Sequence, residues 1–269
     1  ELIVAPPRMS LYAEISQGLR EIYNEYSQQV EPLALDECYL ELTTPQPGQQ
    51  VMEIRRRIQA RFQLPASAGI GPNKYVAKVA SGMAKPNGQR LIPPDQVCNF
   101  LWPLAVEKLW GVGPVTASKL RNHGWHRIEQ VAQESPERLY KVLGKLGPEI
   151  HRLAWGLDDR AVESSWQAKS LSAEHTFERD EDSLARLTDI LQSQAQELER
   201  RLRRRQLLAQ LVVLKLRWPD FSNETKSLRL FRPESQAESL CLPALKHLQG
   251  RLQQTGQAVR LLGLGVCDF

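Results

Sequence analysis

The sequence lacks long apolar runs and is poor in cysteine, with four in 269 residues. No stretch approaches the roughly 18 consecutive apolar residues of a membrane span, so we expect no transmembrane segment. The opening residues, ELIVAPPRMS, have neither a basic start nor a long apolar core, so we expect no signal peptide. The cysteines form no Cys-x-x-Cys pair, which disfavours a cysteine zinc site and predicts reduced thiols in a cytoplasmic protein. They are Cys38, Cys98, Cys241 and Cys267.

A strong excess of one charge is also absent. The net charge is +4, from 35 Lys and Arg against 31 Asp and Glu, and residues 1–100 are balanced. This mildly basic balance permits nucleic-acid binding without demonstrating it. With 42% hydrophobic and 25% charged residues the composition is that of an ordinary globular protein. The length suggests about two domains of roughly 100–150 residues each.

The first part of the chain alternates between helical and strand-like patterns. Apolar residues at helical spacing predict helices over residues 10–29, 50–62 and 74–84. Alternation predicts a single strand over residues 30–43, and the small residues 66–71 predict a short strand. This order predicts an α/β arrangement with helices packed on a sheet.

The rest of the chain has a different texture. Residues 94–162 form short helical patterns separated by glycine and predict an all-helical unit. Residues 163–170 have little periodicity and predict a linker. Residues 171–269 follow the order β-α-β-β-α-β, which predicts a compact α+β domain with one open sheet face. The run Arg200–Arg205 closes the long helix of this domain, where positive charge is favourable, so we interpret it as a solvated helix end rather than a DNA-binding patch.

Asp36 and Glu37 are adjacent within the otherwise apolar segment 30–43. Charged side chains are rarely buried without a partner, so this pair requires an explanation. Neighbours on a strand point to opposite faces, so a strand end or a bend is needed to bring both carboxylates to one metal ion. A solvated pair at the end of the regular strand is an equally good interpretation of the pattern alone.

Two longer motifs favour the metal-binding interpretation. Residues 34–43, ALDECYLELT, resemble the catalytic strand S-x-D-E-A-Y-L-D-x-T of Y-family polymerases, with Cys38 in the place of the commoner alanine. Residues 67–90, SAGIGPNKYVAKVASGMAKPNGQR, resemble the family's G-I-x-x-N-K-x-x-A-K-x-A-S-x-x-x-K-P-N-G block. Both motifs occur in the family's order and spacing. The chain is therefore similar, over essentially all of its length, to Y-family (DinB-type) translesion DNA polymerases.

The resemblance implies a multidomain α+β polymerase. Residues 1–93 would be the C-terminal part of the palm, 94–162 the thumb, 163–170 the linker and 171–269 the DNA-binding little finger. Such an enzyme transfers nucleotidyl groups from deoxynucleoside triphosphates to a primer 3′-hydroxyl, with two Mg²⁺ ions per active site. We expect primer–template DNA and a deoxynucleoside triphosphate as partners, a monomeric state and no membrane.

The resemblance also implies roles for single residues. Asp36 and Glu37 would be catalytic, metal-binding carboxylates, with Glu37 beside the primer 3′-hydroxyl. Lys85, in the sequence KPNG, would contact the incoming triphosphate, although by pattern alone a helix-end lysine is the more ordinary interpretation. Lys74 and Lys78 are expected to be structural or to contact the DNA backbone.

Residues 109–122, LWGVGPVTASKLRN, fit a helix-hairpin-helix. The amides of such a turn approach a phosphate closely, with support from the following helix N-terminus, and bind DNA without reading its sequence. A glycine turn between two packed helices is the alternative. The expected contacts of the turn are Gly111, Val112 and Gly113, with Lys119 nearby, and those of the little-finger sheet are Lys169, Lys226 and Arg229.

The resemblance further implies a strand with the pattern D-x-D-x-F-F well before Leu2, which supplies another metal-binding aspartate and an aromatic steric gate. Without that strand and the fingers, we expect the 269-residue polypeptide alone to be inactive. No convincing sliding-clamp peptide precedes Phe269, so clamp binding stays open. Two other classes remain. An inactive DinB-like accessory protein is disfavoured by the two adjacent carboxylates, and a helix-hairpin-helix glycosylase by the distance from the hairpin to the next aspartate, Asp158.

Overall fold

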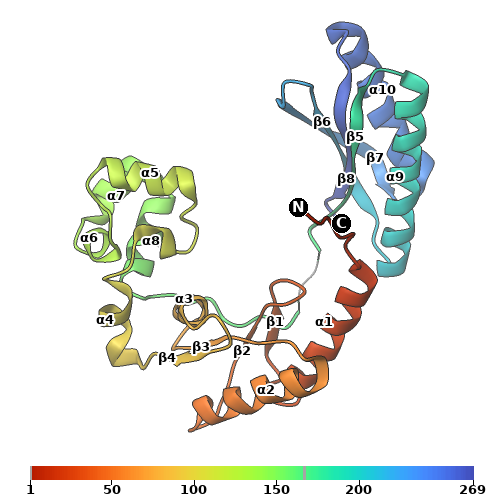
Figure 1. The fold of residues 1–269 in the computed structure, drawn as a ribbon. Helices are drawn as coiled ribbons and strands as arrows, with labels where there is room; N and C mark the ends of the chain where they lie inside the picture. The colour runs from red at the N-terminus through yellow and green to blue at the C-terminus, as the bar shows by residue number, and fades with distance from the viewer. Residues whose placement is uncertain (1, 166–167) are drawn as a thin grey trace. The chain divides into compact units, whose positions relative to one another are not determined.

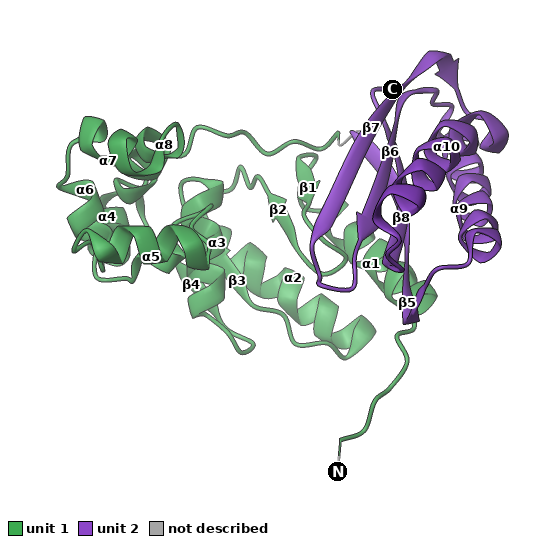
Figure 2. Cartoon of the chain, turned by 90° about the horizontal axis from the view of Figure 1, so that it is seen from above, with its two compact units in different colours: residues 1–166 green, residues 167–269 purple. Residues whose placement is uncertain are grey.

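The computed structural model describes residues 2–165 and 168–269 of the chain (Figure 1). These two stretches form two compact units, which Figure 2 distinguishes by colour. The first unit combines helices with two separate two-stranded sheets, and the second combines helices with one four-stranded sheet, so the predicted α+β class is confirmed. Trp166 and Gln167 of the predicted linker lie outside the described residues. None of the described helices is long and apolar enough to cross a membrane.

Two helices pack together at the start of the first unit. α1 (Met9–Asn24) and α2 (Pro47–Phe62) match the predicted helices apart from shifts at their ends. Leu19 and Ile22 of α1 meet Ile54 of α2 in a small apolar core. The helical spacing of apolar residues thus gives each helix one buried face.

The single strand predicted over residues 30–43 is wrong, because this segment is a β-hairpin. β1 (Val30–Pro32) pairs antiparallel with β2 (Cys38–Leu40), and a short loop joins them. The alternation that suggested one strand included Leu33 and Leu35, which are 39% and 41% exposed in that loop. The pattern counted these leucines as buried residues and so concealed the turn.

The next elements form a β-α-β unit with parallel strands, made of β3 (Ala68–Ile70), α3 (Lys74–Met83) and β4 (Gln89–Leu91). The predicted short strand and third helix are confirmed. Gly69 lets α3 pack close against β3, because a Cβ at this position would collide with the Ala77 carbonyl. β4 was not predicted, since its three residues are all exposed and show no apolar alternation.

From residue 94 the first unit is helical, as predicted. Its core joins Val76 and Ala80 of α3 to Leu101, Leu120 and Leu139 of the short helices. The helical part therefore shares one core with the β-α-β unit. The helices are η1 (Pro94–Gln96), α4 (Val97–Leu101), η2 (Val106–Lys108), α5 (Pro114–Asn122), α6 (Ile128–Ala132), α7 (Pro136–Leu143) and α8 (Leu146–Ala154).

The second unit has the predicted order β-α-β-β-α-β. Its antiparallel sheet has the strand order β5-β8-β6-β7. α9 packs on β5 and β8, and α10 packs on β6 and β7, so within this unit the helices cover one face and leave the other open (Figure 1). The elements are β5 (Ser170–Glu181), α9 (Leu184–Arg205), β6 (Ala209–Arg217), β7 (Asn223–Glu234), α10 (Ala237–Thr255) and β8 (Val259–Cys267).

Candidate active site

A groove of about 610 Å³ lies between the hairpin, α2 and the β3–α3 segment of the first unit. Asp36, Glu37, Lys78 and Lys85 all line it. The structure thus brings together the three residues that the sequence predicts for catalysis, metal binding and triphosphate binding. Lys78, for which the sequence predicts only a structural or backbone-contacting role, joins them.

The hairpin loop carries both carboxylates to the groove. The N–H groups of Leu33 and Ala34 donate to the Glu37 carbonyl at 2.9 and 3.3 Å, which closes the loop. Asp36 is exposed and Glu37 is half-buried. Asp36 lies in the bend of this loop and Glu37 directly precedes β2, so neither carboxylate belongs to a regular strand.

Lysines balance these negative charges. Lys78 Nζ on α3 lies 2.5 Å from Glu37 Oε2. The two side chains are 33% and 41% exposed, so opening this ion pair costs only about 0–1 kcal/mol. Lys85, which follows the end of α3, is exposed at the same groove. Glu37 can therefore exchange Lys78 for another cation without a large loss of stability.

The donor set fits a hard divalent cation. Mg²⁺ prefers oxygen ligands and is commonly held by one or two carboxylates together with water and substrate phosphates. Asp36 and Glu37 supply such a pair. Across residues 2–165 and 168–269 there is no group of three or more His, Cys, Asp or Glu side chains placed to hold a metal. The pair therefore suits an ion whose other ligands come from water and substrate.

Cys38 lies beside this carboxylate pair and is chemically quiet. Burial raises the pKa of its thiol to about 12, and the negative charge of Glu37 contributes in the same direction. The thiol is therefore neutral at physiological pH and competes poorly for a cation. All four cysteines are free, as predicted.

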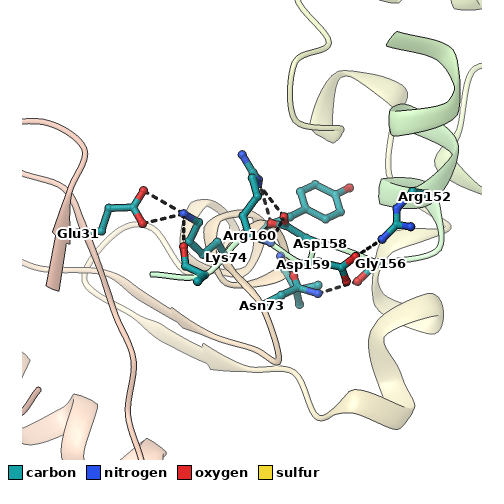
Figure 3. A network of polar contacts seen from close by, with 11 residues as sticks. Glu31, Asn73, Lys74, Arg152, Gly156, Asp158, Asp159 and Arg160 are labelled. Atoms are coloured by element: carbon teal, nitrogen blue, oxygen red, sulfur yellow. Dashed lines mark hydrogen bonds and ion pairs between the residues drawn. The ribbon is translucent and has the colours of Figure 1, made fainter. Parts of the chain in front are cut away.

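A buried ion pair anchors the base of the hairpin to α3 (Figure 3). Lys74 Nζ lies 2.7 Å from Glu31 Oε2 and donates to the Ala161 carbonyl at 2.8 Å. The Lys74 side chain is 9% exposed and the Glu31 side chain 19%. Burial alone would raise the pKa of Glu31, but hydrogen bonds from Lys74 and from the Glu163 N–H outweigh it and lower the pKa. Lys74 is therefore structural, one of the two roles that its sequence context predicts.

The segment that follows α8 also holds the first turn of α3. Asn73 Oδ1 accepts from the Val76 N–H at 3.0 Å, and its side-chain amide donates to the Gly156 carbonyl at 2.7 Å. Asp158 Oδ2 accepts from the Tyr75 N–H at 3.0 Å. Two N–H groups at the helix N-terminus, where no intrahelical partner exists, are thus satisfied by side chains.

Arg160 extends this network toward the helical part. It donates to the two carboxylate oxygens of Asp158 at 2.7 and 2.9 Å, and its guanidinium lies 5.3 Å from the centre of the Trp110 ring. Burial would raise the pKa of Asp158, but the hydrogen bonds from Arg160 lower it below its usual range. The sequence predicted no role for Asp158 or Arg160, and its only signal was a short charged run that follows Gly156, two residues after the end of α8.

The predicted helix-hairpin-helix turn lies between η2 and α5. Gly111 has a φ of +83°, a left-handed conformation that glycine adopts without strain. The Val112 N–H donates to the Leu109 carbonyl at 3.1 Å, and the Val112 side chain is buried, so Val112 holds the turn together. Gly113 precedes α5, and a Cβ placed there would meet no atom within 4 Å. Lys119 is exposed on α5.

The residues of the second unit that the sequence predicts to contact DNA do not all lie on one face of its sheet. Lys169 is exposed just before β5. In the register of β6 and β7, Lys226 lies opposite Leu214 and Arg229 opposite Leu211. Because Leu214 belongs to the core, Lys226 lies on the helix-covered face of β7 and Arg229 on the open face.

The arginine run of α9 is engaged within its own unit. Arg200 and Arg203 form ion pairs with glutamates one turn earlier in the helix. Arg201 donates to the Ser172 carbonyl of the edge strand β5 at 2.7 Å. These contacts agree with the interpretation of the run as a helix end rather than a DNA patch.

Comparisons with known protein families match three segments of the chain. The impB/mucB/samB family matches residues 1–82, and the impB/mucB/samB family C-terminal domain matches residues 168–269. The IMS family HHH motif matches residues 94–124, which contain η2 and α5.

Curated relatives named DNA polymerase IV align with nearly the whole chain. The protein from Bacteroides fragilis (strain YCH46) is 36% identical over 273 residues, which cover 100% of this chain and 75% of the relative. The protein from Leptospira interrogans serogroup Icterohaemorrhagiae serovar Lai (strain 56601) is 36% identical over 275 residues, covering 97% and 75%. The solved structure "Y-family DNA polymerase chimera Dbh-Dpo4(243-245)-Dbh" has the same fold, with a TM-score of 0.90 at 21% identity, covering 99% of this chain and 78% of that chain.

Proposed function

Because the chain belongs to the impB/mucB/samB family of Y-family DNA polymerases, we propose that its groove is the active site of a template-directed polymerase of the translesion type. The enzyme class is DNA-directed DNA polymerase, a nucleotidyltransferase. One observation carries the assignment to this groove. Asp36, Glu37 and Lys85 come from two motifs far apart in the sequence and line the same groove.

In this proposal the carboxylates of the groove bind cations and a lysine binds phosphate. Y-family polymerases use divalent metal ions, and we assign two Mg²⁺ ions to this groove, where they would lower the pKa of the primer 3′-hydroxyl and neutralise the leaving pyrophosphate. Asp36 and Glu37 would hold the cations. Lys85 binds the triphosphate as a point charge. Lys78 holds the Glu37 carboxylate at the groove, and a bound cation would replace Lys78 as the partner of Glu37.

The substrates are primer–template DNA and a deoxynucleoside triphosphate. The helix-hairpin-helix turn binds a phosphate of the DNA backbone through the open side of Gly113, with Lys119 adding positive charge nearby. Lys169 and Arg229 extend this contact on the second unit, and Lys226 has a lesser part because of its face. We propose that the protein acts as a monomer in the cytoplasm, where its four thiols remain reduced.

Substituting Asp36 tests the assignment. In the complete gene product, Asp36→Asn removes one charge from the cation site with little change in shape. Primer extension should fall about a thousandfold or more, since a misplaced metal ion costs several kcal/mol of barrier, while DNA binding stays nearly unchanged. Glu41→Gln, an exposed carboxylate just beyond β2 that does not line the groove, is the matched control. Extension by Asp36→Asn within tenfold of the control would remove Asp36 from the mechanism.

The two other classes have less support. No observation favours an inactive accessory protein, since both carboxylates are present at the groove. A glycosylase would not explain matches to the polymerase family on both sides of the helix-hairpin-helix.

A further inference from the structure

Two glycines of β8 lie on the open face of the second-unit sheet and leave part of it without side chains. In β8, Leu262, Leu264 and Val266 point into the core. Gly263 and Gly265 alternate with them and therefore lie on the opposite, open face. β8 is an inner strand between β5 and β6, so Gly263 is flanked by Glu174 and Lys215, and Gly265 by Ser172 and Val213.

An ion pair crosses the open face at Gly263. Glu174 of β5 and Lys215 of β6 both lie opposite Gly263 in the sheet register. Lys215 Nζ lies 2.9 and 3.0 Å from the two carboxylate oxygens of Glu174. A Cβ at residue 263 would come within 3.0 Å of Glu174 Cγ and 3.4 Å of Lys215 Cβ. A side chain at residue 263 would therefore crowd the pair, and glycine avoids this crowding.

The pair removes a positive charge from the face that we propose to bind DNA. Lys215 shares the open face with Arg217, which donates to Asn223, and with Arg229, which lies 3.4 Å from Asp268. The Glu174 and Lys215 side chains are 38% and 34% exposed, so both can be reached from solvent. With both carboxylate oxygens on its ammonium, Lys215 adds almost no net charge at the centre of the sheet.

We propose that Glu174 limits the affinity of this sheet for the DNA backbone by neutralising Lys215. The proposal rests on the function proposed above, in which the open face contacts DNA phosphates. A phosphate beside a neutral pair meets no net charge and keeps its counterion, whereas a phosphate bound by a free lysine releases one. An exposed ion pair is weak, so its competition changes an equilibrium by up to about fivefold. Glu174 therefore moderates binding without abolishing it.

The test is a set of binding curves for a primer–template duplex at several salt concentrations, measured by fluorescence anisotropy on the complete gene product. Glu174→Gln should bind about two to five times more tightly at low salt, and its salt dependence should be steeper by about one unit of log–log slope. Lys215→Ala should change little in the wild-type background but should cancel the gain in the Glu174→Gln background. Glu197→Gln is the matched control, because it removes the same charge from an exposed ion pair on the helix layer and should leave the slope unchanged.

Two further variants separate this inference from the proposed function. One result would keep the sheet as a DNA surface but overturn the role of Glu174. In that result Lys169→Ala and Arg229→Ala weaken DNA binding, while Glu174→Gln has the same DNA affinity and salt slope as the Glu197→Gln control. That role is equally overturned if Lys215→Ala weakens the wild-type protein as much as it weakens Glu174→Gln. If none of these variants changes binding, the sheet is not a DNA surface, and its proposed role fails together with the inference. Circular dichroism and thermal unfolding of each variant verify that the second unit stays folded.

Discussion

Replacing Lys74 by methionine would leave the Glu31 carboxylate without its main partner in a poorly solvated place. The side chains of the pair are 9% and 19% exposed, and Lys74 Nζ contacts both carboxylate oxygens of Glu31. Breaking a buried ion pair by removing one partner typically costs about 3–5 kcal/mol. Glu31 keeps its hydrogen bond from the Glu163 N–H and some contact with water, which favours the lower end of that range. We therefore expect a loss of about 3 kcal/mol.

The loss should be local. The pair joins β1 to α3 and to the segment around Ala161, which all belong to the first unit. Hydrogen exchange read peptide by peptide should therefore show faster opening of the hairpin, by roughly a hundredfold for about 3 kcal/mol, with β5 to β8 unchanged. Combining Lys74→Met with Glu31→Gln should recover much of the protection, because a neutral amide can still accept from the Glu163 N–H.

Lys141→Met is the control, since Lys141 is exposed on α7 and its replacement should have little effect. The reasoning would be refuted if Lys74→Met reduced hairpin protection by less than about fivefold, the range of an exposed ion pair. It would also be refuted if the double variant were less protected than Lys74→Met alone, because the unpaired carboxylate would then not be the source of the loss.

Three other outcomes are expected. The folded-state pKa values of Glu31 and Asp158 lie below their ordinary values of 4.5 and 3.8. The first unit should therefore have its full stability above about pH 5.5 and lose stability as the pH falls through the ordinary pKa values and then through the lowered ones. Urea unfolding followed by tryptophan fluorescence between pH 7 and 3 measures this loss, and an unfolding midpoint independent of pH would contradict it. Gly113→Val should leave the fold intact, because a Cβ there meets open space, but should weaken binding to DNA of different sequences by a similar factor. Lys119→Ala should reduce the log–log slope of DNA affinity against salt concentration by about one. Unchanged affinity and slope in both variants would assign the turn to packing only. Lys85→Ala should raise the KM for the deoxynucleoside triphosphate about tenfold, for a loss of about 1.4 kcal/mol, with DNA affinity unchanged; steady-state kinetics with an equal KM would exclude Lys85 from triphosphate binding.

The long helices and the second sheet could be predicted from sequence because their apolar residues recur at regular spacing. α9 and the strands of the second unit are clear cases, with core residues such as Leu191 and Leu264 in periodic positions. Short elements could not be predicted in this way. The hairpin was predicted as one strand because Leu33 and Leu35 mimic alternation, and β4 was missed because an exposed strand of three residues has no apolar pattern.

The site shows the same division. Motif resemblance picked out Asp36, Glu37 and Lys85, which line one groove. It did not predict the bond from Asn73 to Gly156 or the place of Asp158 at the N-terminus of α3. These contacts join residues more than eighty positions apart, 83 in each of the two bonds. No local pattern encodes such pairs, because their geometry depends on how α3 packs against the helical part.

The core shared by α3 and the short helices has a consequence for protein engineering. A chimera joined between residues 93 and 94, where the architecture changes from β-α-β to helical, would divide one apolar core between two parents. Val76 and Ala80, each 0% exposed, would face side chains that did not evolve beside them. The bond from Asn73 to the Gly156 carbonyl would also depend on both parents. The groove that we propose as the active site and the helix-hairpin-helix must therefore be inherited as one piece, and α3 cannot be exchanged without its neighbours.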